Sequence, residues 1–265
     1  MHIVDGALSN PVLIGGGVIA AAGVAYSLKK LEPEDLPRVG VLSAVFFVVS
    51  LIHVPLGFSS VHLILNGLLG IILGWAAFPA LVVALLLQAV FFGFGGLTVL
   101  GVNAVNIAFP AVMVFFICRW GITAQQQNLA KLVADALFAI FFVLSIWASV
   151  SLYETYQVEG ATWRVSVNSI SLALFAVVMI YGYILYRRKI LSVAGFWGFL
   201  GGSLSIFFTA IMVAISLALS GDEFAKAAEF VIVAHFPVMA VEGILTAATI
   251  QLITKVKPEL INAVR

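Results

Sequence analysis

The feature that most constrains this chain is a series of long apolar runs. Nine runs of roughly bilayer-spanning length are found at residues 11–28, 38–53, 60–78, 79–95, 103–120, 128–152, 166–187, 195–219 and 226–254. Helices satisfy their own backbone hydrogen bonds, so apolar runs of about 20 residues are typical of transmembrane helices. The sequence predicts an all-α, polytopic integral membrane protein, a single transmembrane domain over 1–265 with about nine spans.

Some of these runs are less regular than the others. The second to fourth are short for a full crossing, and the junction at Pro79 leaves almost no loop. We therefore expect tilted or half-crossing helices in this region. The first apolar run has no basic segment before it and is expected to be retained in the mature chain.

Basic residues predict the orientation, because Lys and Arg near span ends mark the cytoplasmic side. If the chain starts outside, only Arg164 and Lys226 fall on the outer face. Eleven basic residues then face inward: Lys29, Lys30, Arg38, Arg119, Lys131, Arg187, Arg188, Lys189, Lys255, Lys257 and Arg265. We expect a multi-pass protein of the cell inner or plasma membrane, with its N-terminus outside and its C-terminus cytoplasmic.

Composition excludes several function classes. Only 9% of residues are charged, against about a quarter in soluble domains, and the net charge of +1 offers no footprint for nucleic acid. Cys118 is the only cysteine, so a thiolate metal cluster cannot form within one chain. The chain lacks a phosphate-binding loop and an H-E-x-x-H helix, so we expect no enzyme activity and no ATP hydrolysis of its own.

The dipeptide Met1-His2 is a candidate metal chelate. A free α-amino group, the backbone nitrogen of residue 2 and the Nδ1 atom of its ring can close two fused chelate rings in one plane. Planar nitrogen sets suit Ni²⁺ and Cu²⁺, and low-spin Co²⁺ can also accept them. One further imidazole would complete the plane.

A second candidate is the outer loop from His53 to His62, which holds two imidazoles and the hydroxyls of Ser59 and Ser60. We expect His62 to begin the next helix, and either histidine could be the fourth ligand. Ser59 or Ser60 could cap that helix or hold the ring. The alternative is that an interfacial histidine only anchors the loop.

Two further groups are buried candidates. The segment from Gly93 to Gly101 is glycine-rich and is followed by Asn103 and Asn106, which favours either plain packing or support of the outer site. His235 and Glu242 lie seven residues apart in the last run, where a hydrogen-bonded core pair or a transport role is expected.

Four segments resemble one known family. Residues 1–8 (MHIVDGAL) resemble the M-H-I-x-D/E-G-x-L start of the CbiM/NikM family, and 59–63 (SSVHL) are similar to its G/S-x-S-x-H loop. The block 88–106 (QAVFFGFGGLTVLGVNAVN) and the segment 235–246 (HFPVMAVEGILT) also match. These proteins are the substrate-binding membrane components (S components) of energy-coupling factor transporters for cobalt and nickel.

The resemblance implies a nearly square-planar site of four nitrogens on Met1, His2 and His62, and so favours His62 over His53. Supporting residues would be His53, Ser59, Ser60, Asn103, Asn106 and Asp5. It also implies partners: a transmembrane coupling protein, two cytoplasmic ATPases of the ABC class and often a small accessory membrane subunit. No intrinsic cofactor is expected, because Co²⁺ or Ni²⁺ is the cargo.

The chain departs from the family pattern in one large segment. Residues 1–120 and 190–256 form the family-like core, while 121–189 have no counterpart in the usual seven-span pattern and resemble an inserted helical pair. We therefore expect a Co²⁺ or Ni²⁺ uptake component that captures the ion at the outer face. The alternatives are a self-sufficient secondary carrier, and a membrane scaffold or intramembrane enzyme with structural or catalytic histidines.

Overall fold

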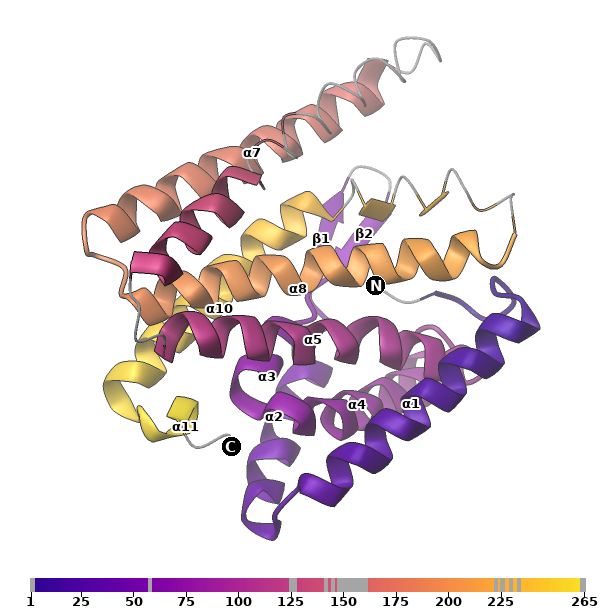
Figure 1. Ribbon diagram of the computed structural model, residues 1–265. Coiled ribbons are helices and arrows are strands. Elements are labelled where there is room, and N and C mark those ends of the chain that lie inside the picture. The colour runs from indigo at the N-terminus through magenta and orange to yellow at the C-terminus, as the bar shows by residue number, and fades with distance from the viewer. Residues whose placement is uncertain are drawn as a thin grey trace.

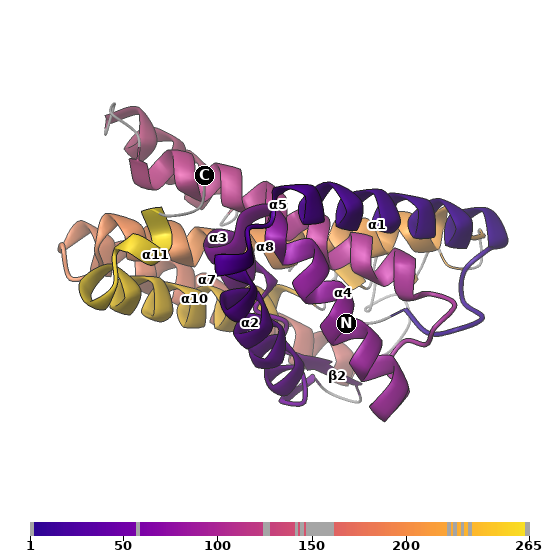
Figure 2. The same cartoon turned by 90° about the horizontal axis from the view of Figure 1, so that it is seen from below.

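The computed structural model describes residues 3–56, 59–123, 128–140, 143, 146, 162–221, 224, 227–228, 231–232 and 235–262. This part of the chain is helical apart from one short antiparallel hairpin, so the predicted all-α class is confirmed with that single addition (Figure 1). The hairpin lies on the same side of the bundle as the start of the described chain in both views (Figure 1, Figure 2).

The elements follow one another in the order α1 (Asn10–Lys30), η1 (Pro33–Asp35), α2 (Leu36–Val49), β1 (His53–Leu56), β2 (Ser59–His62), α3 (Asn66–Leu73), η2 (Gly74–Ala76), α4 (Ala77–Phe92), α5 (Leu100–Thr123), α7 (Thr162–Arg187), α8 (Val193–Ala218), α10 (Phe236–Val256) and α11 (Glu259–Asn262). Residues 128–140 form a further helix before α7.

Five helical stretches among the described residues are long and apolar enough to cross a membrane: Asn10–Lys30, Asn66–Phe92, Leu100–Thr123, Val193–Ala218 and Phe236–Val256. The chain is a multi-pass membrane protein. The runs expected at 60–78 and 79–95 do not form two separate crossings. They form the hairpin and then one apolar stretch that contains α3, η2 and α4.

The break inside this stretch lies at Gly74, not at Pro79. Gly74 ends α3 with a φ of 56°, and the turn η2 follows it. Pro79 lies in the first turn of α4, where a backbone N–H has no partner within the helix and its loss costs little. α2 has 14 residues and thus a length of about 21 Å, short for a 30 Å hydrocarbon core, as expected.

Helix α3 is the centre of the bundle, and all eight of its residues are buried. It packs against α5 and α8, with α4 and α10 also in contact. Small residues make this close approach feasible: Gly70 lies against the backbone of Ala111, and Gly67 against the backbone at Gly201 and Gly202.

Small residues also allow close contact at two other helix–helix crossings. α8 lies between α5 and α10, and Gly202 on α8 touches the carbonyl group of Glu242 on α10. α1 lies along α5, where Gly101 faces Gly17. α7 runs on the outside of the bundle, beside α8 and α10 (Figure 1).

Substitution of Gly70 tests the central packing of α3. A Cβ atom there would collide with the carbonyl group of Ala111, so Gly70→Val is expected to lower the unfolding temperature in detergent by roughly 6–12 °C. Gly40 on α2 is exposed with open space around it, and Gly40→Val should stay within about 2 °C of the parent. Equal unfolding temperatures for the two variants would contradict the tight α3–α5 contact.

Candidate metal site

The hairpin positions His62. Strands β1 and β2 pair in antiparallel register with the Cα atoms of His53 and His62 opposite each other. The Leu63 N–H donates to the Ile52 carbonyl (3.2 Å) and closes the open end of the hairpin. The side chain of His62 is 8% exposed, so the hairpin holds it inside the protein surface.

Two expectations for this loop are wrong. His62 does not begin a helix: it ends β2, and α3 starts four residues later at Asn66. The N-cap position belongs to Leu65, which has a φ of 50°, so neither Ser59 nor Ser60 caps α3. A proline and a glycine in a ten-residue segment favour a turn, and a hairpin lets this turn pair its own backbone groups.

A carboxylate from the last transmembrane helix holds the turn after His62. Glu242, fully buried on α10, accepts hydrogen bonds from the Ile64 N–H (2.5 Å) and the Leu65 N–H (3.0 and 2.9 Å to its two oxygens). The first N–H groups of a helix lack partners within the helix and favour negative charge. Glu242 therefore fixes the chain between His62 and α3.

His235 and Glu242 do not form the hydrogen-bonded pair that their spacing suggested. The carboxylate of Glu242 binds the backbone after His62, whereas the Nδ1 atom of His235 contacts the carbonyl group of Val231. The Nε2 atom of His235 has no hydrogen-bond partner among the described residues. His235 is the N-cap residue of α10 and makes no side-chain hydrogen bond to the start of that helix.

The described N-terminal segment is attached to α5 by Asn103. The Ile3 N–H donates to the Asn103 side-chain oxygen (3.1 Å), and the Asn103 side-chain nitrogen donates back to the Ile3 carbonyl (3.0 Å). This pair of bonds fixes the peptide groups on both sides of Ile3. Met1 and His2 themselves lie outside the described residues.

Asp5 attaches the same segment to the glycine-rich loop between α4 and α5. Its N–H donates to the Gly95 carbonyl (2.9 Å), and its carboxylate accepts from the Thr98 hydroxyl and the Val99 N–H (3.3 Å). Gly96 has a φ of 124°, and a Cβ atom there would collide with the Asp5 carboxylate. The glycines therefore serve the close approach of the N-terminal segment.

His62 and the N-terminal segment contact neighbouring residues of this one loop. The rings of His62 and Phe94 are parallel, with centroids 6.3 Å apart and 4° between planes, while Gly95 binds Asp5. Burial lowers the pKa of His62 below its usual value, which favours the neutral form of its ring. A neutral imidazole is the form that binds a metal ion.

The other residues expected to support the site are Asn106, His53, Ser59 and Ser60. Asn106 faces α8, where its oxygen accepts from the Ser216 hydroxyl (3.2 Å), so it supports helix packing and not the N-terminal segment. The side chains of His53, Ser59 and Ser60 lie outside the described part. Phe94 and Thr98 contribute contacts that sequence reasoning did not single out, although both lie in the glycine-rich block.

The described side chains around His62 are not sufficient by themselves to bind a metal ion. Within the described residues, no three His, Cys, Asp or Glu side chains gather at one point. The ligand set expected from the sequence uses instead one amine, one backbone nitrogen and two imidazoles. Of these four groups, the structure describes the ring of His62.

Comparison with known proteins gives one family and several relatives. The model of the CbiM family, described as "Cobalt uptake substrate-specific transmembrane region", matches residues 2–167 and 158–260. A Haemophilus influenzae protein named for metal transport is 53% identical over 126 residues, which cover 48% of this chain and 61% of that one. The "Fused nickel transport protein NikMN" of Rhodobacter capsulatus is 40% identical over 121 residues, 43% of this chain and 35% of the relative.

The fold also matches a solved structure. A protein described as a transition metal transporter superposes with a TM-score of 0.56 at 22% identity, covering 98% of this chain and 95% of the other. This likeness concerns the fold alone. The chain spans less than two thirds of the length of the two curated relatives given above.

The two asparagines of α5 allow a matched test of the N-terminal attachment. Asn103→Leu removes two hydrogen bonds to Ile3 and should speed amide hydrogen exchange of the N-terminal segment about 5- to 150-fold. Asn106→Leu, one turn further along the same helix, should leave that exchange rate unchanged. Equal rates in the two variants, measured by mass spectrometry, would exclude Asn103 as the attachment point.

Proposed function

Because the chain belongs to the CbiM family, whose members are substrate-specific transmembrane regions for cobalt uptake, we propose that it is the metal-binding membrane component of a Co²⁺ or Ni²⁺ importer. The ion would be captured at the outer face and released inward. The choice between the two metals is left to experiment, because imidazole and amide nitrogen accept both ions.

The proposed site consists of the Met1 amine, the backbone and ring nitrogens of His2 and the ring of His62. One observation carries it: the N-terminal segment and His62 meet at adjacent residues of one loop, Gly95 and Phe94. Ile3 follows His2 directly, so fixing its peptide groups restricts where the two preceding residues can reach. Asn103, Asp5 and Glu242 would be positioning residues in this proposal.

Transport also needs an energy source and partners. The sequence contains no phosphate-binding loop, so we propose that two ATPase subunits and a transmembrane coupling protein drive the cycle, with a small accessory membrane subunit in some assemblies. The family-like core would be 1–120 and 190–256, and 121–189 would be an inserted helical pair.

Extension of the N-terminus by one residue tests the chelate. The amine, the amide nitrogen and the ring must be in register, so one residue added before Met1 should abolish binding of Co²⁺ and Ni²⁺ in calorimetry. The unfolding temperature should stay at the parent value, because Ile3 and Asp5 keep their contacts. Unchanged affinity in the extended protein would rule out the proposed ligand set.

Substitution of the two hairpin histidines tests which of them is the fourth ligand. His62→Ala should weaken metal binding by more than about 100-fold, because a ligand is lost, and His53→Ala by less than about 3-fold. The reverse order would move the fourth ligand to His53.

Cysteine labelling tests the proposed orientation. Cys118 is the only cysteine and is fully buried, so single introduced cysteines report their own location. In intact cells, Asn10→Cys should react with a membrane-impermeant maleimide and Lys257→Cys should react only after lysis. Labelling of Lys257→Cys in intact cells would refute a cytoplasmic C-terminus, and an Asn10→Cys that reacts only after lysis would refute an outward N-terminus.

A further inference from the structure

A basic pocket lies at the end of α7 that the sequence places on the cytoplasmic side. It has a volume of about 470 Å³, and Lys131, Arg187 and Lys189 line it together with Ser192 and Val193 at the start of α8. The one ion pair in the described part of the chain joins Arg38 and Asp35, so these three cations have no carboxylate partner there. The N-terminus of the 26-residue helix α8 adds favourable polarity for an anion.

The surroundings of this pocket leave its positive charge in excess. Arg187 lies over the ring of Tyr183, 5.9 Å from its centroid, and that contact leaves its charge in place. Asp135 is the acidic residue nearby and acts electrostatically on Tyr186. Three cations against one carboxylate favour a ligand with negative charge.

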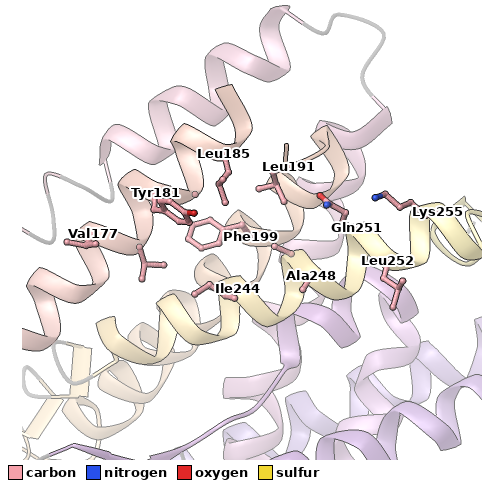
Figure 3. A pocket seen from close by; sticks show the side chains of 13 residues that line it. Val177, Tyr181, Leu185, Leu191, Phe199, Ile244, Ala248, Gln251, Leu252 and Lys255 are labelled. Carbon is pink, nitrogen blue, oxygen red and sulfur yellow. The ribbon is translucent and has the colours of Figure 1, made fainter. Parts of the chain in front are cut away.

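An apolar groove continues from the basic pocket. It has a volume of about 590 Å³ and lies between α7, α8 and α10, with Tyr181, Gly182, Phe199 and Ala248 among its walls (Figure 3). Leu191 lines both the groove and the basic pocket, so the two hollows meet at that residue.

Apart from the Tyr181 hydroxyl, the polar side chains of the groove lie toward this junction. Lys255 and Gln251 lie near Leu191, away from Val177 at the other end (Figure 3). The Gln251 side-chain oxygen accepts from the Ser192 N–H (3.0 Å), which fixes α10 to the start of α8 at the junction.

We propose that this composite site binds one anionic phospholipid, with the phosphate in the basic pocket and an acyl chain along the groove. A headgroup at the cationic end and hydrocarbon at the apolar end match the charge and polarity of the two hollows. The occupant comes from the bilayer, on which the groove opens beside the exposed side chains of Val177 and Tyr181. The segment 121–189, which supplies α7 and Lys131, thereby builds a lipid site on the core helices α8 and α10.

The test uses the full chain purified in detergent and freed of lipid, in native mass spectrometry. The probes are phosphatidylglycerol, phosphatidylcholine with the same acyl chains, and glycerol phosphate as a headgroup without chains. Phosphatidylglycerol is expected to bind at one molecule per chain, at least about 10-fold more tightly than phosphatidylcholine. Glycerol phosphate should not compete with it.

One pair of variants tests whether the basic pocket binds the phosphate. Arg187→Gln with Lys189→Gln should weaken phosphatidylglycerol binding about 30-fold, because two cations next to the phosphate are lost. The control replaces another exposed basic pair on the same predicted face, Lys29→Gln with Lys30→Gln, and should change binding less than about 3-fold.

Gly182→Leu should fill the groove, since a Cβ atom there meets only the Phe199 ring at 3.9 Å. It should weaken binding of the lipid at least about 10-fold, while Gly40→Leu on α2 should not. Ala248→Phe fills the groove from the opposite wall and replaces Gly182→Leu if that variant fails to fold.

Three outcomes would overturn the proposal. Equal affinity for the two phospholipids would remove the role of charge. Glycerol phosphate that competes as well as the lipid would indicate a free-phosphate site. Binding unaffected by both groove-filling variants would mean that no acyl chain lies there. Because no metal enters these measurements, their failure would leave the proposed metal transport unaffected.

Discussion

The hydrogen bonds from Ile64 and Leu65 to the Glu242 carboxylate are the interaction on which the rest of the structure depends. A helix interrupted inside a bilayer exposes backbone N–H groups that hydrocarbon cannot satisfy, each at a cost of several kcal/mol. Here such donors lie between the hairpin and α3, and a buried carboxylate from α10 accepts from the Ile64 and Leu65 N–H groups. Without this acceptor, the short central helix could not begin where it does, and His62 would lose its fixed position.

Elsewhere in the core, polar side chains also form hydrogen bonds with backbone groups. Asn66 donates to the Ile107 carbonyl (3.0 Å), Ser43 to the Ala80 carbonyl (2.8 Å) and Ser27 to the Trp75 carbonyl (2.7 Å). Each bond joins two elements at a point where small residues or a helix break bring them close. Asn103 extends this pattern to the N-terminal segment. In the described part of the chain, polar side chains thus act mainly as partners for backbone groups of other elements, with few side-chain pairs among them.

Much of the fold could be predicted from the sequence, because runs such as 103–120 and 195–219 carry both length and apolar character. The hairpin could not, since strands of four residues are too short for a clear alternation and their apolar residues blend into the neighbouring runs. Asn103 and Asn106 lie one turn apart, and only the packing of α5 shows that one faces Ile3 and the other Ser216. The partners of Glu242 are backbone groups, which leave no trace in the residue pattern. For the site, the sequence singled out His62 and Asn103, and the ligand set itself stays a prediction.

The full burial of α3 has a consequence for how the protein is made. By itself the eight-residue α3 is too short to cross the bilayer, and it is long enough only together with η2 and α4, in the stretch Asn66–Phe92. Its neighbours α5, α8 and α10 are all synthesised after it, and Glu242 lies 177 residues beyond Leu65. At about 5–20 residues per second, that interval takes roughly 9–35 s. During this time the Ile64 and Leu65 N–H groups lack their Glu242 acceptor, so the chain after His62 reaches its final position only once α10 is in place.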